Sequence, residues 1–237
     1  VKRGHTPFNS LSLDLKDNAY FISIAFHPSN DLIALGRSDK KICILDDIYN
    51  GKPITLLGNN NTGCLENIED IIFGPTGKYL AGSDPNKGIV VWNVFSKEIC
   101  GYIKNNLSNQ FFRITAISFS PDEKYLSAIA QYQGYYRILI WDVPSWQFVH
   151  TSVKFNAYSK SHAWSSQIEA LPKAISYFLL IGDSVCFQVW KLINSHNQLI
   201  SQLYWREGYS RFNTESIKLK RCTGLSVLNY KLLSQAS

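Results

Sequence analysis

Residues 68–94, IEDIIFGPTGKYLAGSDPNKGIVVWNV, hold three short apolar strands separated by two clusters of turn residues. The first strand ends at Phe73, and the turn after it carries Pro75, which fixes φ, together with glycines that accept a positive φ. The third strand is rich in β-branched residues and ends in Trp92-Asn93. With a further apolar stretch at 98–103, this unit predicts one antiparallel sheet of four strands.

The same unit recurs along the chain, marked by two landmarks that keep step. The first is a Phe-x-Pro phrase whose prolines are 47 and 46 residues apart, found as Phe26-His27-Pro28, Phe73-Gly74-Pro75 and Phe119-Ser120-Pro121. The second is a bulky residue before a polar one, spaced 47, 49 and 49 residues apart, found as Leu45-Asp46, Trp92-Asn93, Trp141-Asp142 and Trp190-Lys191. A period of this length indicates one supersecondary unit repeated in space.

A single sheet of this kind cannot bury both of its faces, whereas sheets stacked around an axis bury them and leave short edges. The sequence therefore predicts an all-β fold, a β-propeller of four-stranded antiparallel blades. Four to five blades are present as part of a larger ring, since propellers have about four to eight blades of roughly 40–45 residues. A β-sandwich also alternates strands and turns, but it gives no reason for both landmarks to recur in register.

We assign the blades by residue range. Three blades span 21–63, 64–106 and 107–155, a divergent blade spans 156–207, and a partial blade spans 208–237. Residues 1–20 are expected to be either the outer strand of a preceding blade or a tail. The absence of Met from all 237 residues favours a fragment of a longer protein, with the missing blades supplied there or by another chain.

These repeats resemble the WD-repeat β-propeller family. Trp141-Asp142 is the family's signature dipeptide, and the other three bulky-polar pairs are degenerate copies. The position of the family's turn aspartate, between the second and third strands, is held by Asp39, Asp84 and Asp183. The family often has a Gly-His pair before the first strand, and no repeat here has one. The resemblance therefore implies that the family's buried His–Ser/Asp–Trp network is absent.

A narrower likeness is to the WD-repeat proteins of cilia and flagella. It rests on the phrases 88–93 and 119–126 and on the short fourth unit, where 178–183 runs almost directly into 185–190. This likeness implies a non-catalytic scaffold for protein–protein interaction in a ciliary, axonemal or other microtubule-associated assembly. The implied partners are tubulin or other axonemal proteins, and the implied location is the cytoplasm, the cytoskeleton and the axoneme of a cilium or flagellum.

Charge and composition leave a second function open. The net charge is +6 with a pI of about 9.0, which suits an acidic partner such as a microtubule surface or nucleic acid. The alternative is a nuclear or ribosome-assembly propeller with a basic face that contacts RNA. The candidate contacts are Trp164 and a basic cluster of Lys218, Lys220 and Arg221. Trp164 is expected in a long link across 144–167, which is a loop apart from an outer strand at 147–150, and there it either anchors a partner or folds back on its blade.

The sequence shows no catalytic or cofactor motif. It lacks a phosphate-binding loop and a Gly-x-Ser-x-Gly elbow, and its turn aspartates are explained by hydrogen bonds to turn amides. The five cysteines are scattered without metal-ligand spacing, which favours free thiols in a reducing compartment. No run of 18 apolar residues predicts a membrane span. We therefore expect no enzyme activity, no cofactor, no metal site and no membrane partner.

Overall fold

A computed structural model gives the fold, and it describes most of the chain between residues 20 and 208. The described residues are 20–29, 31–45, 53–57, 65–104, 106–107, 110–143, 145–152, 154–155, 159–171, 174–183, 186–195 and 198–208. Every regular element in this part of the chain is a β-strand.

Four sheets of four strands follow one another along the chain, and we number them blades 1 to 4. Blade 1 contains β1 (Phe21–Phe26), β2 (Ile33–Arg37), β3 (Ile42–Leu45) and β4 (Pro53–Leu57). Blade 2 contains β5 (Asp70–Phe73), β6 (Tyr79–Asp84), β7 (Gly88–Asn93) and β8 (Ile99–Lys104). Blade 3 contains β11 (Arg113–Phe119), β12 (Tyr125–Tyr132), β13 (Tyr135–Asp142) and β14 (Phe148–Thr151). Blade 4 contains β15 (Ser159–Leu171), β16 (Ala174–Asp183), β17 (Cys186–Ser195) and β18 (Gln198–Gly208). A two-stranded ribbon, β9 (Asn106–Leu107) with β10 (Gln110–Phe111), links blades 2 and 3.

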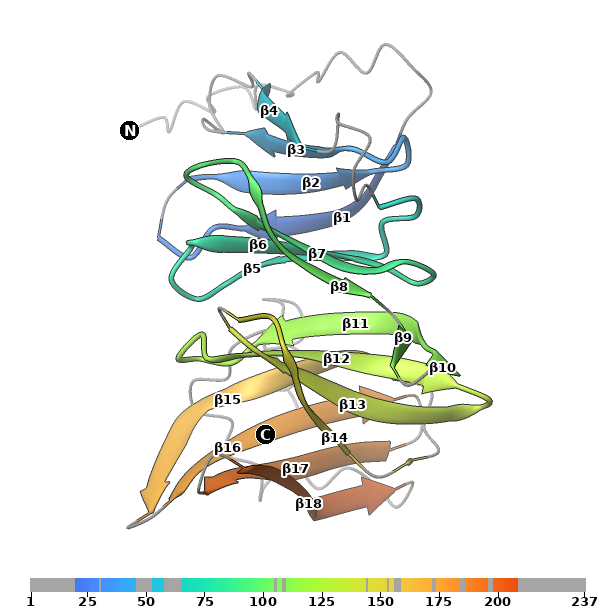
Figure 1. The fold of residues 1–237 in the computed structure, drawn as a ribbon, viewed down its shortest axis with the longest axis vertical. Helices are drawn as coiled ribbons and strands as arrows, with labels where there is room; N and C mark the ends of the chain where they lie inside the picture. Colours follow the sequence, from blue (N-terminus) through green and yellow to red (C-terminus); the bar gives the residue numbers. More distant parts are fainter. Residues whose placement is uncertain are drawn as a thin grey trace, which may run out of the picture.

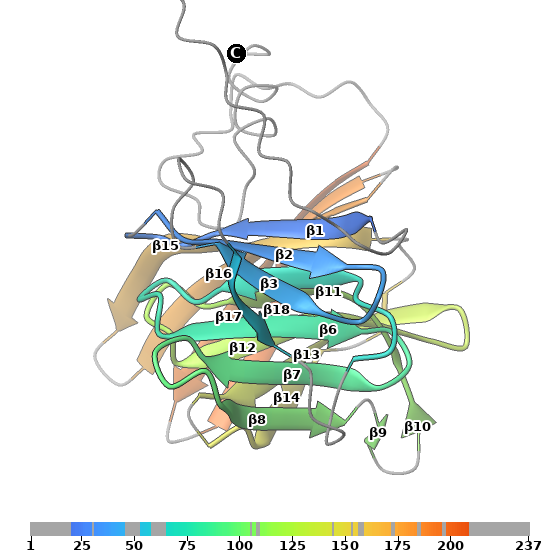
Figure 2. The ribbon, with the colours of Figure 1, turned by 90° about the horizontal axis from the view of Figure 1, so that it is seen from above.

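Each blade is an antiparallel meander whose first strand lies innermost. The blades are stacked in chain order from blade 1 to blade 4 (Figure 1), and the view from above shows the successive sheets overlying one another (Figure 2). The first strand of each blade packs on the first and second strands of the blade before it, in the contacts of β5 with β1 and β2, of β11 with β5 and β6, and of β15 with β11 and β12. This is the arrangement of a β-propeller arc.

The core consists of three apolar layers, one between each pair of neighbouring blades. The bulky landmark residue of strand three faces the preceding blade: Trp92 lies in the layer between blades 1 and 2, Trp141 in the next, and Trp190 in the last. The strand alternates, so its other face meets the following blade. The equivalent Leu45 of blade 1 lies in a smaller cluster with Ile33, Leu35 and Cys43.

The polar residue of the second landmark builds the turn into the outer strand. In blade 2 the Asn93 side-chain oxygen accepts hydrogen bonds from the N–H groups of Phe95 and Ser96. In blade 3 the Asp142 carboxylate accepts one from the Ser145 hydroxyl. In both turns, the residue four positions after the polar landmark donates its backbone N–H to the landmark's carbonyl at 2.8 Å: Lys97 to Asn93 and Trp146 to Asp142. Lys97 and Trp146 both have a positive φ, in the left-handed region. The Trp-Asp phrase is thus a packing residue followed by a turn former.

The predicted all-β propeller of four-stranded blades is confirmed for four blades. The four sheets span residues 21–57, 70–104, 113–151 and 159–208, and the exact unit boundaries stay predictions. Residues 1–19 and 209–237, assigned to a preceding strand or tail and to a fifth blade, lie outside the described residues. The predicted link across 144–167 holds the expected outer strand, β14, but its loop is wrong from Ser159 onward, because β15 begins there and pairs with β16.

Gly77 provides a test of how tightly the blades pack. It has φ +76°, and a Cβ there would overlap His27 Nε2 of blade 1. Gly134 is a matched control, because it has φ +81° and open space around it. We expect Gly134→Ala to lower the free energy of unfolding by about 1 kcal/mol through backbone strain alone. Gly77→Ala should cost about 1–2 kcal/mol more, because His27 must also give up its hydrogen bond. Urea unfolding of the two variants measures both costs, and equal costs would contradict the packing described.

Candidate functional site

A row of side-chain contacts joins the turns between first and second strands in neighbouring blades, and we call it the first-turn seam. Between blades 1 and 2, His27 Nε2 lies 3.2 Å from the Gly77 carbonyl oxygen, while His27 Nδ1 accepts from the N–H of Ser29. A carbonyl only accepts, so Nε2 carries the proton. Between blades 2 and 3, the Thr76 hydroxyl donates to the Glu123 carboxylate. These contacts connect residues about one repeat apart in sequence.

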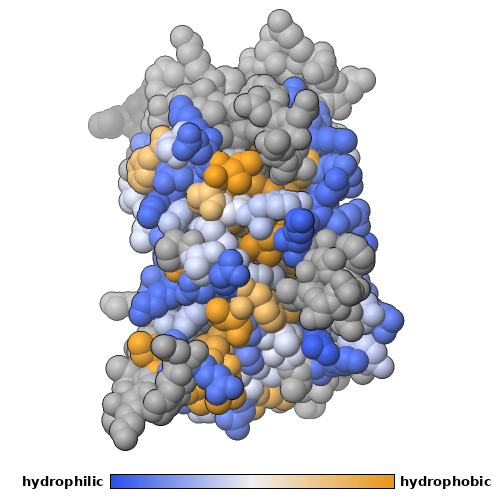
Figure 3. Space-filling model, viewed as in Figure 1, coloured by the Kyte–Doolittle hydropathy of each residue, from blue (hydrophilic) through white to orange (hydrophobic). Residues whose placement is uncertain are grey.

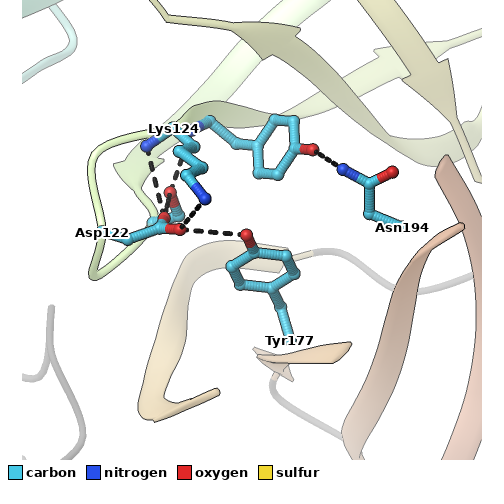
Figure 4. A network of polar contacts seen from close by, with 6 residues as sticks. Asp122, Lys124, Tyr177 and Asn194 are labelled. Carbon is cyan, nitrogen blue, oxygen red and sulfur yellow. Dashed lines mark hydrogen bonds and ion pairs between the residues drawn. The ribbon is translucent and has the colours of Figure 1, made fainter. Parts of the chain in front are cut away.

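The seam continues between blades 3 and 4 as a network around Asp122 (Figure 4). The Asp122 carboxylate accepts from the Ser120 hydroxyl at 2.8 Å and from the Tyr177 hydroxyl at 2.9 Å. Beside it, the Asn194 amide donates to the Tyr125 hydroxyl at 2.6 Å. Burial, and then the hydrogen bond to Asp122, raise the pKa of Tyr177, so its hydroxyl stays a donor. The network joins blade 3 to blade 4 by two side-chain hydrogen bonds.

A buried His–Ser–Trp cluster also lies between blades 3 and 4. Ser127 of β12 donates to the Ser118 carbonyl at 3.0 Å and receives the Trp164 indole N–H at 2.9 Å. His162 Nε2 lies 2.8 Å from the same hydroxyl. This cluster differs from the family network that the sequence analysis expected to be absent, because it bridges two blades and because His162 and Trp164 both lie on the first strand of blade 4.

This cluster is built for structure rather than nucleophilic catalysis. The only proton of the Ser127 hydroxyl is given to the Ser118 carbonyl, so His162 must act as a donor to that oxygen, not as a base. Burial lowers the pKa of His162 to about 4, which keeps the imidazole neutral. Its Nδ1 is buried without a hydrogen-bond partner. Both side chains lie in the core, out of reach of a substrate.

Asp84 ties two loops of blade 2 together. It is fully buried, and its carboxylate accepts four backbone N–H bonds. One oxygen binds the N–H groups of Asn86 and Lys87 in the following turn, and the other binds those of Glu66 and Asn67 in the segment before β5. Asp39, at the corresponding place in blade 1, pairs with Arg37 at 2.7 Å instead. The same turn position therefore performs two different tasks.

Asp70 joins the innermost strands of three blades. Its carboxylate receives the Ser23 hydroxyl of β1 at 3.4 Å and the backbone N–H of Ile117 in β11, while Asp70 itself lies in β5. Burial raises the pKa of Asp70 to about 6, and the hydrogen bonds oppose this shift only in part. The carboxyl thus titrates within the physiological range while it bridges the blades.

A groove of about 520 Å³ lies between blades 2 and 3. It sits at the ends where second strands turn into third strands, which the meander places opposite the first-turn seam. Its lining includes two aromatic side chains in contact, side-chain amides and one cation, and consists of Pro85, Asn86, Phe112, Arg113, Gln131, Tyr132, Gln133 and Gly134. The Arg113 guanidinium is more than half exposed and lies 3.8 Å from the Glu69 carboxylate.

The structure gives no sign of a metal centre or a membrane-spanning helix in its described part. Among the described residues, no three His, Cys, Asp or Glu side chains gather in a way that could hold a metal ion. No helix in this part of the chain is long and apolar enough to cross a membrane. Cys43 and Cys100 are free thiols, and burial raises the pKa of the Cys43 thiol, which makes it less reactive.

Of the two roles considered for Trp164, the partner anchor is wrong, because the side chain folds into the blades. It has no exposed surface, because it is an inward-facing residue of β15 that packs edge-on against Tyr177. It anchors blade 4 to blade 3 and is not available to a partner. The other candidate contacts, Lys218, Lys220 and Arg221, lie outside the described residues, as does Asp46.

The repeat landmarks lie at equivalent places in the blades. Pro28, Pro75 and Pro121 are in the first turns, and Asp183 ends β16. Phe73 and Phe119 pack toward the preceding blade, whereas Phe26 is exposed. The sequence did not point to the groove, because its lining comes from turns far apart in the chain. The adjacent Phe112-Arg113, an aromatic beside a cation ahead of a strand, was the one local signal.

Comparisons with known proteins add little beyond the fold. No protein-family model matches the chain, and no curated protein matches its sequence. Among solved structures, the chain is similar to the WD40 domain of SCAP from fission yeast, with 17% identity and a TM-score of 0.49. That match covers 60% of this chain and 32% of the other, so the chain spans about a third of that structure's length. The case for a partial propeller rests on the four sheets themselves.

Asp84 and Asp39 form a matched pair for mutation. Asp84→Asn replaces one carboxylate oxygen with an NH₂ group that faces N–H donors and cannot accept from them. We expect this to lower the free energy of unfolding by about 2–4 kcal/mol, since two charge-assisted bonds are lost inside the blade. Asp39→Asn removes a partly exposed ion pair and should cost less than about 1 kcal/mol. Chemical denaturation compares them, and similar costs would show that Asp84 is not the loop tie described.

Asp70 predicts a specific pH dependence. Its folded pKa of about 6 exceeds the usual 3.8, so the folded state holds a proton that the unfolded state has lost between these values. The contribution to stability is therefore present below pH 4 and is lost as the pH rises through 6. Asp70→Asn mimics the protonated form, so its stability relative to wild type should rise by about 2–3 kcal/mol from pH 4 to pH 7.5. Denaturant unfolding across this range measures the difference, and a constant offset would refute the raised pKa.

Proposed function

We propose that this chain is a non-catalytic scaffold for protein–protein interaction and that the groove between blades 2 and 3 receives an extended segment of its partner. One observation carries this proposal: the groove combines an aromatic contact, Phe112 with Tyr132, with side-chain amides and an exposed guanidinium at its edge. By contrast, the titratable groups buried in the blade interfaces are engaged in structural contacts.

The chemistry of the lining selects the kind of segment that fits. Amides from Asn86 and Gln131 can pair with the backbone of an extended peptide, and Arg113 offers its fork to a carboxylate. The whole chain carries a net charge of +6, which favours approach by an acidic partner. The partner segment is therefore an acidic one, with an apolar side chain placed over the aromatic floor.

The finer form of the proposal is a microtubule-associated assembly, in particular that of a cilium or flagellum. It is supported by the sequence phrases shared with ciliary WD-repeat proteins and by the match between a basic chain and an acidic protein surface. Tubulin or another axonemal protein is the partner to test first. The RNA-binding alternative predicts the same salt dependence, so it must be separated by the identity of the ligand.

Co-sedimentation with polymerised microtubules tests the proposal. Wild type should pellet with microtubules, and Arg113→Glu should weaken binding at least tenfold because a charge-assisted contact becomes a repulsion. Lys104→Glu makes the same charge change on the outer strand β8 and should weaken binding less than about threefold.

If the two variants weaken microtubule binding equally, binding depends on net charge, and the groove is not the binding site. If microtubules are not bound, affinity purification with and without nuclease distinguishes the remaining cases. Enrichment of RNA-processing proteins that disappears with nuclease would support the RNA alternative over the scaffold on microtubules.

A further inference from the structure

The hairpin formed by the second and third strands is longer in blade 3 than in blade 2. β12 and β13 have 8 residues each, whereas β6 and β7 have 6 each. In both blades this hairpin begins at a tyrosine and ends at the polar landmark, so the additional residue pairs of blade 3 lie at the turn. At about 3.3 Å per residue, they lengthen the hairpin by about 7 Å. The hairpin reaches beyond the strands of blade 2 (Figure 1), and its tip lines the groove.

The turn fixes the position of the side chains at this tip. Tyr132 pairs with Tyr135, and the two residues between them, Gln133 and Gly134, have φ values of +48° and +81°. Two successive residues with positive φ form the two-residue turn that matches the twist of an antiparallel hairpin. Because paired residues lie on the same face of a sheet, Tyr135 stands beside Tyr132. Tyr135 is 41% exposed.

The strand register shows which way this face points. Phe155 pairs with Tyr136, and both side chains lie in the apolar layer between blades 3 and 4. The residues directly before them, Lys154 and Tyr135, therefore project to the opposite side, toward blade 2. The Lys154 ammonium lies 4.8 Å from the centre of the Tyr135 ring, and Tyr132 packs on the layer between blades 2 and 3. The aromatic surface of the groove thus continues outward to a second cation.

Two exposed cations stand at the ends of this aromatic surface. At one end the Arg113 guanidinium lines the groove and reaches Glu69 of blade 2. A guanidinium has five N–H donors, so Arg113 can bind a second carboxylate besides that of Glu69. At the other end stands Lys154, which is exposed beside Tyr135. We call this set of residues the hairpin wall, and it consists of Phe112, Arg113, Tyr132, Tyr135 and Lys154.

The same register sets the separation of the two cations. One row of paired residues runs from Arg113 in β11 across β12 and β13 to Phe155, the neighbour of Lys154. Three steps between strands, each of about 4.8 Å, give a separation of about 14 Å. An extended peptide rises about 3.4 Å per residue, so this separation corresponds to about four residues. In such a peptide, side chains two and four positions apart point to the same side.

We propose that the partner segment crosses the hairpin wall at right angles to its strands and carries the pattern acidic-x-apolar-x-acidic. Its two carboxylates bind Arg113 and Lys154, and its central apolar side chain packs on Tyr132 between them. This inference rests on the proposed function. It adds a second anchoring cation outside the groove and a spacing between the acidic residues of the partner.

Two labelled peptides test the spacing. The probe is a fluorescein-labelled peptide that contains Glu-Ser-Leu-Ser-Glu, and its isomer contains Glu-Glu-Ser-Leu-Ser, which has the same composition with adjacent acidic residues. Fluorescence polarisation should show that the wild-type chain binds the probe about threefold to fivefold more tightly than the isomer, because the isomer reaches one cation at a time.

Charge reversal at the second cation tests the contact itself. Lys154→Glu should weaken binding of the probe about tenfold, because an attraction becomes a repulsion, and it should remove the preference for the probe over the isomer. Lys97→Glu is the matched control. It makes the same change of charge at an exposed residue in the turn between β7 and β8, at the opposite end of blade 2 from the groove. It should weaken binding less than about twofold.

The outcomes separate this inference from the proposed function. Equal binding of probe and isomer by the wild-type chain, or equal effects of Lys154→Glu and Lys97→Glu, would overturn the second anchor and leave the groove proposal standing. The same holds if the wild-type chain binds microtubules but neither peptide. If it binds neither the peptides nor microtubules, both proposals are wrong. Circular dichroism of the two variants checks that the fold is retained.

Discussion

The structure depends on one constraint: each four-stranded sheet has two apolar faces, and each face must be covered by a neighbouring sheet. The bulky landmark of strand three meets this need in one direction, since Trp92, Trp141 and Trp190 all point toward the preceding blade. On the third strands of blades 2 and 3, the residues that alternate with the tryptophan are β-branched and face the following blade. Stability is therefore built from nearest-neighbour layers, and a blade without a neighbour leaves apolar surface uncovered. In Figure 3, apolar patches remain between polar side chains on one side of the arc.

Polar contacts fix the position of each blade relative to the next. The contacts of the first-turn seam link residues roughly one repeat apart, and each needs a close approach of two turns. Gly74 and Gly77 allow this approach, because a Cβ at either position would overlap Glu123 or His27 of the adjacent blade. Apolar layers alone would tolerate sliding, since hydrophobic contact has no preferred direction. The seam removes that freedom at one end of the blades and leaves the opposite end to form the groove.

The fold could be predicted from the sequence because its signals are local and repeated. A turn proline together with a bulky residue about 18 positions later identifies one blade, whatever blade packs beside it. Trp164 could not be placed this way, because the polar stretch around it resembles a loop until Ser127 of another blade is known to receive its indole N–H. The same limit applies to the turn aspartates. Asp84 and Asp39 look alike in sequence, but Asp84 binds the N–H groups of the segment before the first strand of its blade, whereas Asp39 pairs with Arg37.

Two of the buried titratable groups, Asp70 and His162, act on different blade interfaces and with opposite sign. Asp70 bridges blades 1, 2 and 3, and its raised pKa makes that junction weaker as the pH rises through 6. His162 lies between blades 3 and 4, and its pKa of about 4 lies below its usual 6.5. Its contribution is therefore complete above pH 6.5 and is lost as the pH falls toward 4. The two effects oppose one another in the global stability of the chain. Acidification thus favours the junction that holds Asp70 and disfavours the interface between blades 3 and 4 that holds His162.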